Sequence, residues 1–204
     1  MADRWATFDC YGTLVDWNSG IASVIGTELL ERYHEAEPQV EADHPTMSYR
    51  DVMRETAHRI GFGDTDALGE SLPGWPVFPE VPAALNEARE RGWKLVILSN
   101  TDREFIESSM ASIGVHFEFA VVASEIGSYK PALGHWRAFE DLVGRLPTVH
   151  VGASHHHDVV PASGLGIPTV WINRLGETAM PAPSRELSDL RGLPETLDAL
   201  APGE

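Results

Sequence analysis

The sequence predicts an α/β fold, a doubly wound parallel sheet with a small inserted helical cap. Two observations predict the sheet: short apolar runs recur along the chain, and segments with helical periodicity separate most of them. Strands buried on both faces read as continuous apolar runs, and helices between them supply the crossovers of a parallel sheet. A third observation, a long helical stretch without a strand near the N-terminus, predicts the cap.

Five apolar runs are expected as strands, namely Trp5–Phe8, Leu95–Leu98, Phe119–Ala123, Val149–Val151 and Thr169–Ile172. The helical patterns between them are Ala83–Arg91, Arg103–Ile113, Leu133–Val143 and Val159–Gly164. The stretch after Gly176 is rich in proline and polar residues, which predicts a loop followed by one short helix near Leu193–Leu200.

The expected cap contains the helical patterns Ile21–Glu35, Tyr49–Ile60 and Ala67–Ser71. The proline-rich segment Pro73–Pro82 then indicates the return of the chain to the sheet. The predicted boundaries are therefore 17–73 for the cap, and 1–16 together with 74–204 for the Rossmann-like core.

Composition restricts the class of protein. A chain of 204 residues fits one compact domain with a modest insertion. Its 43% hydrophobic and 23% charged residues exclude a disordered or fibrous chain. No apolar run is long enough to span a membrane, and the N-terminus has no apolar core of a signal peptide. The single cysteine, Cys10, cannot form an internal disulfide, which favours a reducing, cytoplasmic location.

Charge restricts the partners. The formal net charge is −16, and the sequence has no Lys/Arg cluster. Nucleic acids and anionic membrane surfaces are bound through such clusters, so neither is expected as a partner. An anionic small molecule can bind only where a local Lys or Arg reverses the field. A homodimer is compatible with the sequence, which does not decide the oligomeric state.

Polar residues follow four of the expected strands. They are Asp9, then Ser99 and Asn100, then Lys130, and then Ser154 to Asp158. In doubly wound sheets, functional groups gather at the carboxyl ends of the strands, so these side chains are expected at one edge. Each alone has a structural explanation: an aspartate after a strand is usually a cap or turn residue, and Lys130-Pro131 fits a solvated turn. Their occurrence together in this topological order favours a catalytic site.

Four segments carry a resemblance to the haloacid dehalogenase superfamily of aspartate-nucleophile hydrolases. FDCYGTLVDW (Phe8–Trp17) resembles its first motif, LSN (Leu98–Asn100) its second and SYKP (Ser128–Pro131) its third. HVGASHHHDVVPASGLGIPTVWINR (His150–Arg174) is similar to its fourth motif and the strand beyond. The resemblance covers nearly the whole chain and implies an inserted cap. It further implies the site residues, namely a nucleophile at Asp9, support from Tyr11 and Thr13, substrate contacts from Ser99 and Asn100, a charge-balancing Lys130 and an acidic Asp158.

Two departures indicate the branch of the superfamily. Phosphatases of this superfamily carry a second aspartate two residues after the nucleophile, where this chain has Tyr11. An alkoxide needs that general acid to leave, whereas a halide does not. The phosphatases also place a magnesium-binding acid five residues before the last motif aspartate, where this chain has Ala153. The resemblance therefore implies a type II 2-haloacid dehalogenase that needs no metal and no cofactor.

The implied mechanism has two steps. Asp9 attacks the carbon that bears the halogen, while Lys130 keeps the Asp9 carboxylate ionised and oriented. Ser99 and backbone N–H groups hold the substrate carboxylate. Asp158, with Ser154 or His155 as a relay, positions the water that hydrolyses the aspartyl ester. Consecutive histidines on a strand-to-helix turn point apart, so we do not expect His155, His156 and His157 to share a metal ion.

The cap of such a dehalogenase supplies an arginine that binds the halide. Arg32 is the candidate here, with a solvated arginine on a helix face as the alternative interpretation. The aromatic residues Tyr11, Trp17, Trp75 and Trp136 are candidates for the lining of an apolar pocket around the carbon–halogen bond, with a place in the core as the alternative interpretation of each.

The leading hypothesis is hydrolytic dehalogenation of a short 2-haloalkanoic acid, an anionic small molecule, to a 2-hydroxy acid. The alternatives are a phosphatase acting on a small phosphorylated metabolite, or a weakly active protein that keeps the fold and its anion pocket.

Overall fold

The fold is built on one parallel sheet. The computed structural model describes residues 3–178 and 180–201. Six strands lie in the order β3-β2-β1-β4-β5-β6, and all neighbouring pairs run parallel. The strands are β1 (Arg4–Phe8), β2 (Trp93–Ser99), β3 (Phe119–Val122), β4 (Val149–Gly152), β5 (Thr169–Ile172) and β6 (Arg185–Leu187). The predicted doubly wound α/β class is confirmed.

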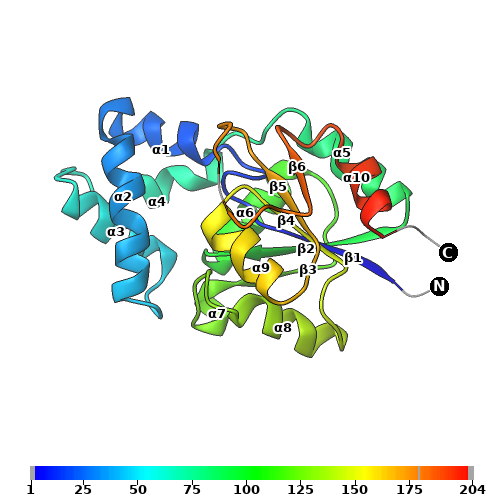
Figure 1. The fold of residues 1–204 in the computed structure, drawn as a ribbon. Helices are drawn as coiled ribbons and strands as arrows, with labels where there is room; N and C mark the ends of the chain where they lie inside the picture. The colour runs from blue at the N-terminus through cyan, green and yellow to red at the C-terminus, as the bar shows by residue number, and fades with distance from the viewer. Residues whose placement is uncertain (1–2, 179, 202–204) are drawn as a thin grey trace.

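Helices cover both faces of the sheet (Figure 1). Alternate side chains of β2 reach opposite faces: Leu95 and Ile97 belong to one buried cluster, and Val96 and Leu98 belong to the other. The first cluster includes side chains of α5 (Val81–Glu90), α6 (Arg103–Ile113) and α10 (Leu193–Leu200). The second includes α8 (Gly134–Val143) and α9 (Val160–Gly164). The short helix α7 (Ala123–Ile126) follows β3 directly.

The order of strands reverses at β1. Strands β2 and β3 lie on one side of β1, and β4 to β6 lie on the other. Phe8 at the end of β1 is in register with Ile97 and Val151, so the three central strands end close to the same level. Ligands of open α/β sheets bind in the crevice outside such a reversal, beyond the carboxyl ends of the strands.

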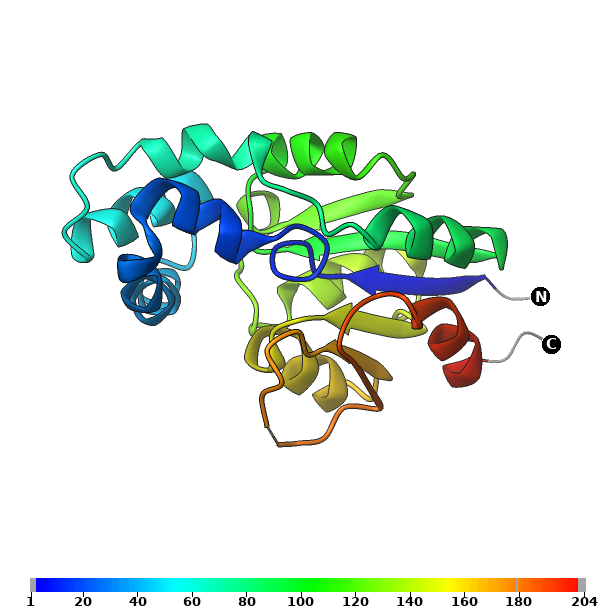
Figure 2. The ribbon, with the colours of Figure 1, turned by 90° about the horizontal axis from the view of Figure 1, so that it is seen from above.

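Four helices and a 3₁₀ turn lie beyond this edge of the sheet (Figures 1 and 2). They are α1 (Trp17–Ile25), α2 (Thr27–Asp43), α3 (Tyr49–Arg59), α4 (Ala67–Ser71) and η1 (Leu72–Gly74). Their apolar side chains, such as Ile21, Tyr33, Val52 and Leu68, extend the first buried cluster into this segment. These helices and the 3₁₀ turn span residues 17–74.

The first expected helix of the insertion, Ile21–Glu35, is divided in two. Gly26 adopts φ 81°, donates its N–H to the Ala22 carbonyl and ends α1. Only glycine adopts this backbone region without strain, so the break is encoded locally. Helix α2 then continues past the predicted end and through Pro38 to Asp43.

The helical segment is tied to the core at the start of α3. Asp102, at the N-terminus of α6, accepts hydrogen bonds from the backbone N–H groups of Tyr49 and Arg50, each at 2.9 Å. Helix N-termini have unpaired N–H groups, so a carboxylate from a different element serves here as a cap. Arg50 also pairs with Glu104 at 2.8 Å.

The sixth strand is absent from the sequence prediction. β6 has three residues, two of them exposed, and pairs only with β5 at the edge of the sheet. So short and polar a segment has no apolar alternation to detect. Within the described residues, the helices are all too short or too polar to cross a lipid bilayer.

Candidate active site

A cavity of about 450 Å³ lies beyond the carboxyl ends of the strands. Its floor is formed by the loops after β1, β2 and β4, and its opposite wall is formed by α1, α2 and α3. The sequence-predicted residues that line it are Asp9, Tyr11, Ser99, Asn100, Lys130, Ser154 and Asp158. Residues separated by more than a hundred positions in the chain therefore meet at one site, as the topological argument predicts.

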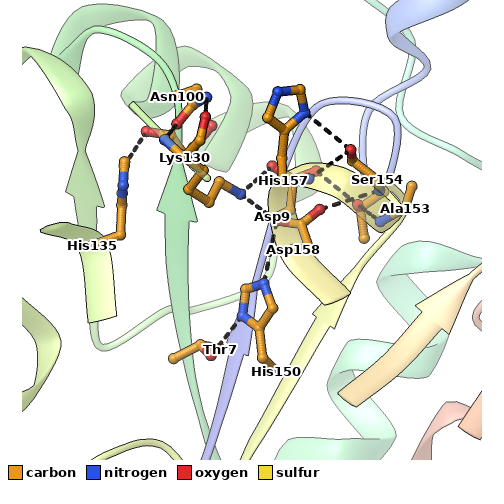
Figure 3. A network of polar contacts seen from close by, with 12 residues as sticks. Thr7, Asp9, Asn100, Lys130, His135, His150, Ala153, Ser154, His157 and Asp158 are labelled. Atoms are coloured by element: carbon orange, nitrogen blue, oxygen red, sulfur yellow. Dashed lines mark hydrogen bonds and ion pairs between the residues drawn. The ribbon is translucent and has the colours of Figure 1, made fainter. Parts of the chain in front are cut away.

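Lys130 bridges the two predicted aspartates (Figure 3). Its Nζ lies 3.0 Å from Asp9 Oδ1 and 2.6 Å from Asp158 Oδ1. The three residues are almost completely buried, with exposed fractions of 2% for Lys130, 8% for Asp9 and 0% for Asp158. Charges removed from water need such partners, so the three groups form one electrostatic unit.

The unit separates the pKa values of its two aspartates. Burial raises the pKa of Asp9, and the hydrogen bonds from Lys130 and Thr13 oppose this shift. Burial acts in the same direction on Asp158, but Lys130 and His150 hold the pKa of Asp158 below its usual value. Burial would lower the pKa of Lys130, yet Asp158 and Asp9 raise it above its usual value. Lys130 is therefore cationic throughout the neutral range.

Thr13 orients the second oxygen of Asp9. Its hydroxyl donates to Asp9 Oδ2 at 2.8 Å and accepts from the backbone N–H of Ala153 at 2.8 Å. The threonine is completely buried and does not line the cavity. It is a positioning residue that joins the loop after β1 to the loop after β4.

His150 is a functional residue that sequence reasoning missed. Its Nε2 lies 3.3 Å from Asp158 Oδ1, and its Nδ1 lies 2.9 Å from Thr7 Oγ1. Burial lowers the pKa of His150, so the ring is neutral. Because a carboxylate only accepts, Nε2 carries the proton and Nδ1 accepts from Thr7. The feature of the sequence that could have identified this residue is a histidine inside an otherwise apolar strand.

Gly152 allows Asp158 to approach the strand. A Cβ at this position would lie 2.4 Å from the Asp158 carboxylate. The backbone N–H of Ser154 donates to Asp158 Oδ2 at 3.2 Å. Both oxygens of Asp158 are thus engaged by fixed donors, which makes Asp158 an anchor for Lys130.

The three consecutive histidines point in different directions. His155 Nε2 lies 2.8 Å from the Pro181 carbonyl, and its ring packs edge-on against Trp171, outside the cavity. His156 is exposed. His157 lines the cavity, with its Nδ1 3.0 Å from Ser154 Oγ, and burial lowers its pKa to about 4. The expectation that His155 contacts the substrate is therefore corrected, and the histidine of this segment that lines the cavity is His157. The π-helical turn η2 (His155–Val159) determines which histidine faces the cavity, and the periodicity of the sequence does not indicate such a turn.

Ser99 and Asn100 differ in their roles. The Asn100 side chain accepts from Lys130 N at 2.6 Å and donates to the Lys130 carbonyl at 3.0 Å, so it fixes the lysine backbone. Ser99 Oγ is buried and has no hydrogen-bond partner among the described residues. A buried hydroxyl without a partner is costly, so its place in the cavity lining indicates a polar ligand.

Two predicted substrate contacts, Arg32 and Trp136, need correction. Arg32 is exposed and does not line the cavity, because it lies on another face of α2. Trp136 is completely buried in the cluster beneath α8, edge-on to His150 at 5.1 Å, and also lies outside the cavity. Tyr11 does line the cavity, but its hydroxyl bonds to Ser109 Oγ at 3.0 Å and its ring stacks on Tyr49.

Other lining residues were not singled out by the sequence for this site. Glu37 and Glu41 of α2 lie on the wall opposite Asp9, and Arg174 follows β5. The Arg174 guanidinium pairs with Glu80 at 2.8 Å, donates to the Thr13 carbonyl at 2.9 Å and covers the Phe78 ring.

These residues do not fit a magnesium ion. The facing oxygens of Asp9 and Asp158 both bond to the Lys130 ammonium, and Tyr11 and Ala153 supply no further carboxylate. Across residues 3–178 and 180–201, no cluster of three His, Cys, Asp or Glu side chains is arranged to hold a metal.

Residues 4–166 match the haloacid dehalogenase-like hydrolase family, and the chain belongs to that family. It is 28% identical over 220 residues to the (S)-2-haloacid dehalogenase of Pseudomonas sp. (strain YL), which covers 95% of this chain and 94% of the relative. It is 30% identical over 123 residues to the phosphoserine phosphatase of Thermus thermophilus, covering 57% of this chain and 49% of that protein.

The fold also resembles a solved dehalogenase. The L-2-haloacid dehalogenase from Xanthobacter autotrophicus with chloropropionic acid covalently bound superposes with a TM-score of 0.85. The alignment covers 98% of this chain and 100% of that one at 18% identity. The predicted family and the predicted hydrolase class are thus confirmed.

Proposed function

We propose that this hydrolase cleaves the carbon–halogen bond of a short 2-haloalkanoic acid and releases a 2-hydroxy acid. The observation that carries the proposal is the environment of Asp9: a carboxylate held by Lys130 and Thr13, in a cavity where the position for a leaving-group acid is Tyr11. Tyr11 cannot serve as that acid, because burial raises its pKa and its hydroxyl faces Ser109. A halide leaves without protonation, whereas an alkoxide does not.

In the first step, an Asp9 oxygen attacks C2 of the substrate, the carbon–halogen bond breaks, and the halide leaves with the electron pair. The product is an ester between C2 and Asp9. Lys130 and Thr13 hold the carboxylate in place, and Lys130 offsets the negative charge of both reactants. Ser99 Oγ, which has no protein partner, donates to the substrate carboxylate.

In the second step, water attacks the Asp9 carbonyl carbon, and the bond between this carbon and the ester oxygen breaks. The 2-hydroxy acid leaves with the proton that the base took from water, and the Asp9 carboxylate is regenerated as its remaining proton passes to solvent. His157 is the base, since its ring is neutral and lines the cavity beside Asp158. When Nδ1 carries the proton and donates to Ser154 Oγ, Nε2 is free to accept a proton from water. Asp158 is a weaker base, because Lys130, His150 and the Ser154 N–H hold its oxygens and keep it ionised.

We further propose that residues 17–73 act as a cap over a core formed by residues 1–16 and 74–204; residues 1–2, 179 and 202–204 lie outside the described part. The helical wall of the cavity supports this division, because substrate bound at Asp9 is enclosed by α1, α2 and α3. Exclusion of bulk water strengthens the electrostatic interactions inside such a site.

The test is a panel of 2-haloacids and phosphate esters, assayed for halide and phosphate release with and without a metal chelator. We expect halide release that survives chelation, because no divalent cation is needed to neutralise a monoanionic substrate. Phosphate release that a chelator abolishes and magnesium restores would establish the phosphatase instead.

A single turnover in ¹⁸O-labelled water tests the ester. With enzyme in excess, we expect unlabelled hydroxy acid and label in the peptide that contains Asp9, because water attacks the aspartyl carbonyl. A labelled product with unlabelled Asp9 would exclude the ester and indicate direct attack by water.

A further inference from the structure

The departing halide has no evident cationic partner in the cavity. Arg32 lies elsewhere, and Lys130 and Arg174 are the Lys and Arg side chains among the described lining residues. Lys130 is shared by Asp9 and Asp158, and Arg174 pairs with Glu80. The Arg174 guanidinium also donates to the Thr13 carbonyl at 2.9 Å.

Two carboxyl groups occupy the wall that faces Asp9. Glu37 and Glu41 lie one turn apart on α2 and line the cavity together. Glu37 Oε1 accepts from Tyr49 at 2.7 Å and from Tyr33 at 3.3 Å, and Glu41 Oε2 accepts from Asn100 at 3.2 Å. One oxygen of each carboxyl group thus accepts from protein donors. The other oxygen, Oε2 of Glu37 and Oε1 of Glu41, has no hydrogen-bond partner among the described residues.

Burial favours the neutral form of this pair, whereas the hydrogen bonds that Tyr49 and Tyr33 donate to Glu37 oppose it. The titratable and charged groups that face it are Tyr33 and His34 of α2, Tyr49 of α3, Tyr129 and Lys130 of the loop before α8, and Asp9 after β1. Only Lys130 is a cation, and it already has two aspartate partners. Burial is the largest cause that raises the pKa of Glu37, to about 7, and that raises the pKa of Glu41 well above its usual value.

The bonding fixes where each proton lies. Trp17 Nε1 donates to Tyr49 Oη at 3.2 Å, and Tyr49 in turn donates to Glu37 Oε1. Because Oε1 already accepts from Tyr49, the proton of a neutral Glu37 lies on Oε2. By the same reasoning, the amide of Asn100 leaves Oε1 as the protonated oxygen of Glu41.

We propose that Glu37 and Glu41, as neutral acids, bind the departing halide by donating hydrogen bonds from the oxygens that have no protein partner. The inference rests on the proposed dehalogenation and adds its halide site. The electron pair of the carbon–halogen bond moves to the halide, which accepts the hydrogen bonds, and both glutamates keep their protons. The unpartnered Ser99 hydroxyl in the same cavity independently indicates a ligand with an acceptor group there. Ser99 then serves the substrate carboxylate and the glutamates serve the halogen.

The charge of the pair decides between two opposite ligands. Neutral acids donate to an anion, whereas two carboxylates beside Asp9 would repel a halide and attract an ammonium group. An anionic substrate in this cavity requires the neutral form.

Bromide binding at constant ionic strength tests the proposal without turnover. We would measure the dissociation constant of sodium bromide by calorimetry at pH 5.5 and pH 9 in the Asp9→Asn variant, in which the nucleophile neither titrates nor reacts. We expect affinity to fall at least about tenfold at pH 9, because each lost hydrogen bond to a charged acceptor is worth about that factor. Affinity that does not change with pH would overturn the proposal.

Glutamine variants distinguish binding by a neutral hydrogen-bond donor from binding by a carboxylate. Glu41→Gln and Glu37→Gln keep an N–H donor and cannot ionise, so the double variant should bind bromide equally well at both pH values. Glu41→Ala should weaken binding at pH 5.5. Glu35→Gln, an exposed position on the same helix, is the matched control and should behave as the parent protein. Thermal unfolding shows that each variant is folded.

Two results would assign the site differently and overturn the inference. A short alkylammonium ion that binds more tightly at pH 9, and is lost in the glutamine variants, would identify a cation site. Loss of bromide binding in Arg174→Met with unchanged binding in the glutamine variants would place the halide at Arg174. Because bromide binding needs no substrate, a failed inference is distinguishable from a failed dehalogenase assay, which concerns the proposed function.

Discussion

At the scale of single residues, the chemistry of this site depends on one lysine that is buried between two aspartates. A substitution that removes its charge leaves Asp9 and Asp158 buried with no cation between them. Like charges at this distance raise the pKa of at least one carboxyl group. Asp9 then loses both its ionised state and its orientation.

Lys130→Met should therefore reduce kcat by at least about a hundredfold, because removing a buried charge partner costs several kcal/mol. The expected readout is halide release under saturating substrate, with circular dichroism to show that the fold is kept. Lys94→Met, at a half-exposed lysine on β2, is the control and should keep full activity. Near-normal turnover in Lys130→Met would remove this lysine from the catalytic residues.

Substitutions of His157 and of His155 should have different effects, although the two residues are close in the sequence. His157→Gln should slow hydrolysis of the ester more than its formation, because the neutral base in the cavity is lost. Mass spectrometry of the peptide that contains Asp9 should then detect the 2-carboxyalkyl group of the substrate, bound as an ester. His155→Gln should not accumulate the ester, since this ring bonds to Pro181 outside the cavity. Accumulation in both variants, or in neither, would contradict the assignment of the base.

The residues that the sequence predicted well share one property. Asp9, Ser99, Asn100, Lys130 and Asp158 follow strands or strand-end loops, so topology alone brings them together. Glu41 could not be found in this way, because its place in the site depends on packing of α2 against a residue 59 positions away. In the sequence, it is one of several acids on a polar helix.

At the scale of elements, the contact between α6 and α3 positions the wall of the cavity. Asp102 caps α3 from the core, and Tyr49 at that helix end holds Glu37. Periodicity identified both helices and their lengths closely, but it carries no information about this contact. A cap usually comes from the residue before its own helix.

Asp102→Ala should lower the free energy of unfolding by about 1–3 kcal/mol, since two buried N–H groups lose a charged acceptor. Urea denaturation measures the loss, and hydrogen exchange should accelerate at the amides of Tyr49 and Arg50. Glu104→Ala, in the first turn of α6, is the matched control, since it removes only the exposed ion pair with Arg50. An equal loss in both variants would show that Asp102 does not act through the helix end.

At the scale of the whole molecule, a few acids of this acidic chain lie inside the fold, where their ionisation affects stability. The net charge is −16; on α2, Glu41 is buried and Glu37 is half-buried. From the composition, we expect an anion to bind only where a basic residue offsets the negative potential of the protein. The structure meets that condition at Lys130 but adds carboxyl groups opposite it, which composition cannot locate.

Glu37 should make the folded protein less stable as pH rises. Burial raises its pKa in the folded state to about 7, from 4.5 in an exposed chain. Between these values the folded protein holds a proton that the unfolded chain has released, so unfolding becomes easier with increasing pH. The loss is complete above about pH 7 and amounts to at most about 3 kcal/mol.

The difference between Glu37→Gln and the parent protein isolates this contribution, because the carboxyl groups that stabilise at high pH, such as Asp158, are present in both. We expect the variant to gain stability relative to the parent from pH 4.5 to pH 7, with no further change above that range. Urea denaturation at a series of pH values measures it. Glu35→Gln, exposed on the same helix, should give a difference that does not vary with pH. A flat difference for Glu37→Gln as well would mean that Glu37 ionises normally in the folded protein, and the neutral acid required for halide binding would then be absent at that residue.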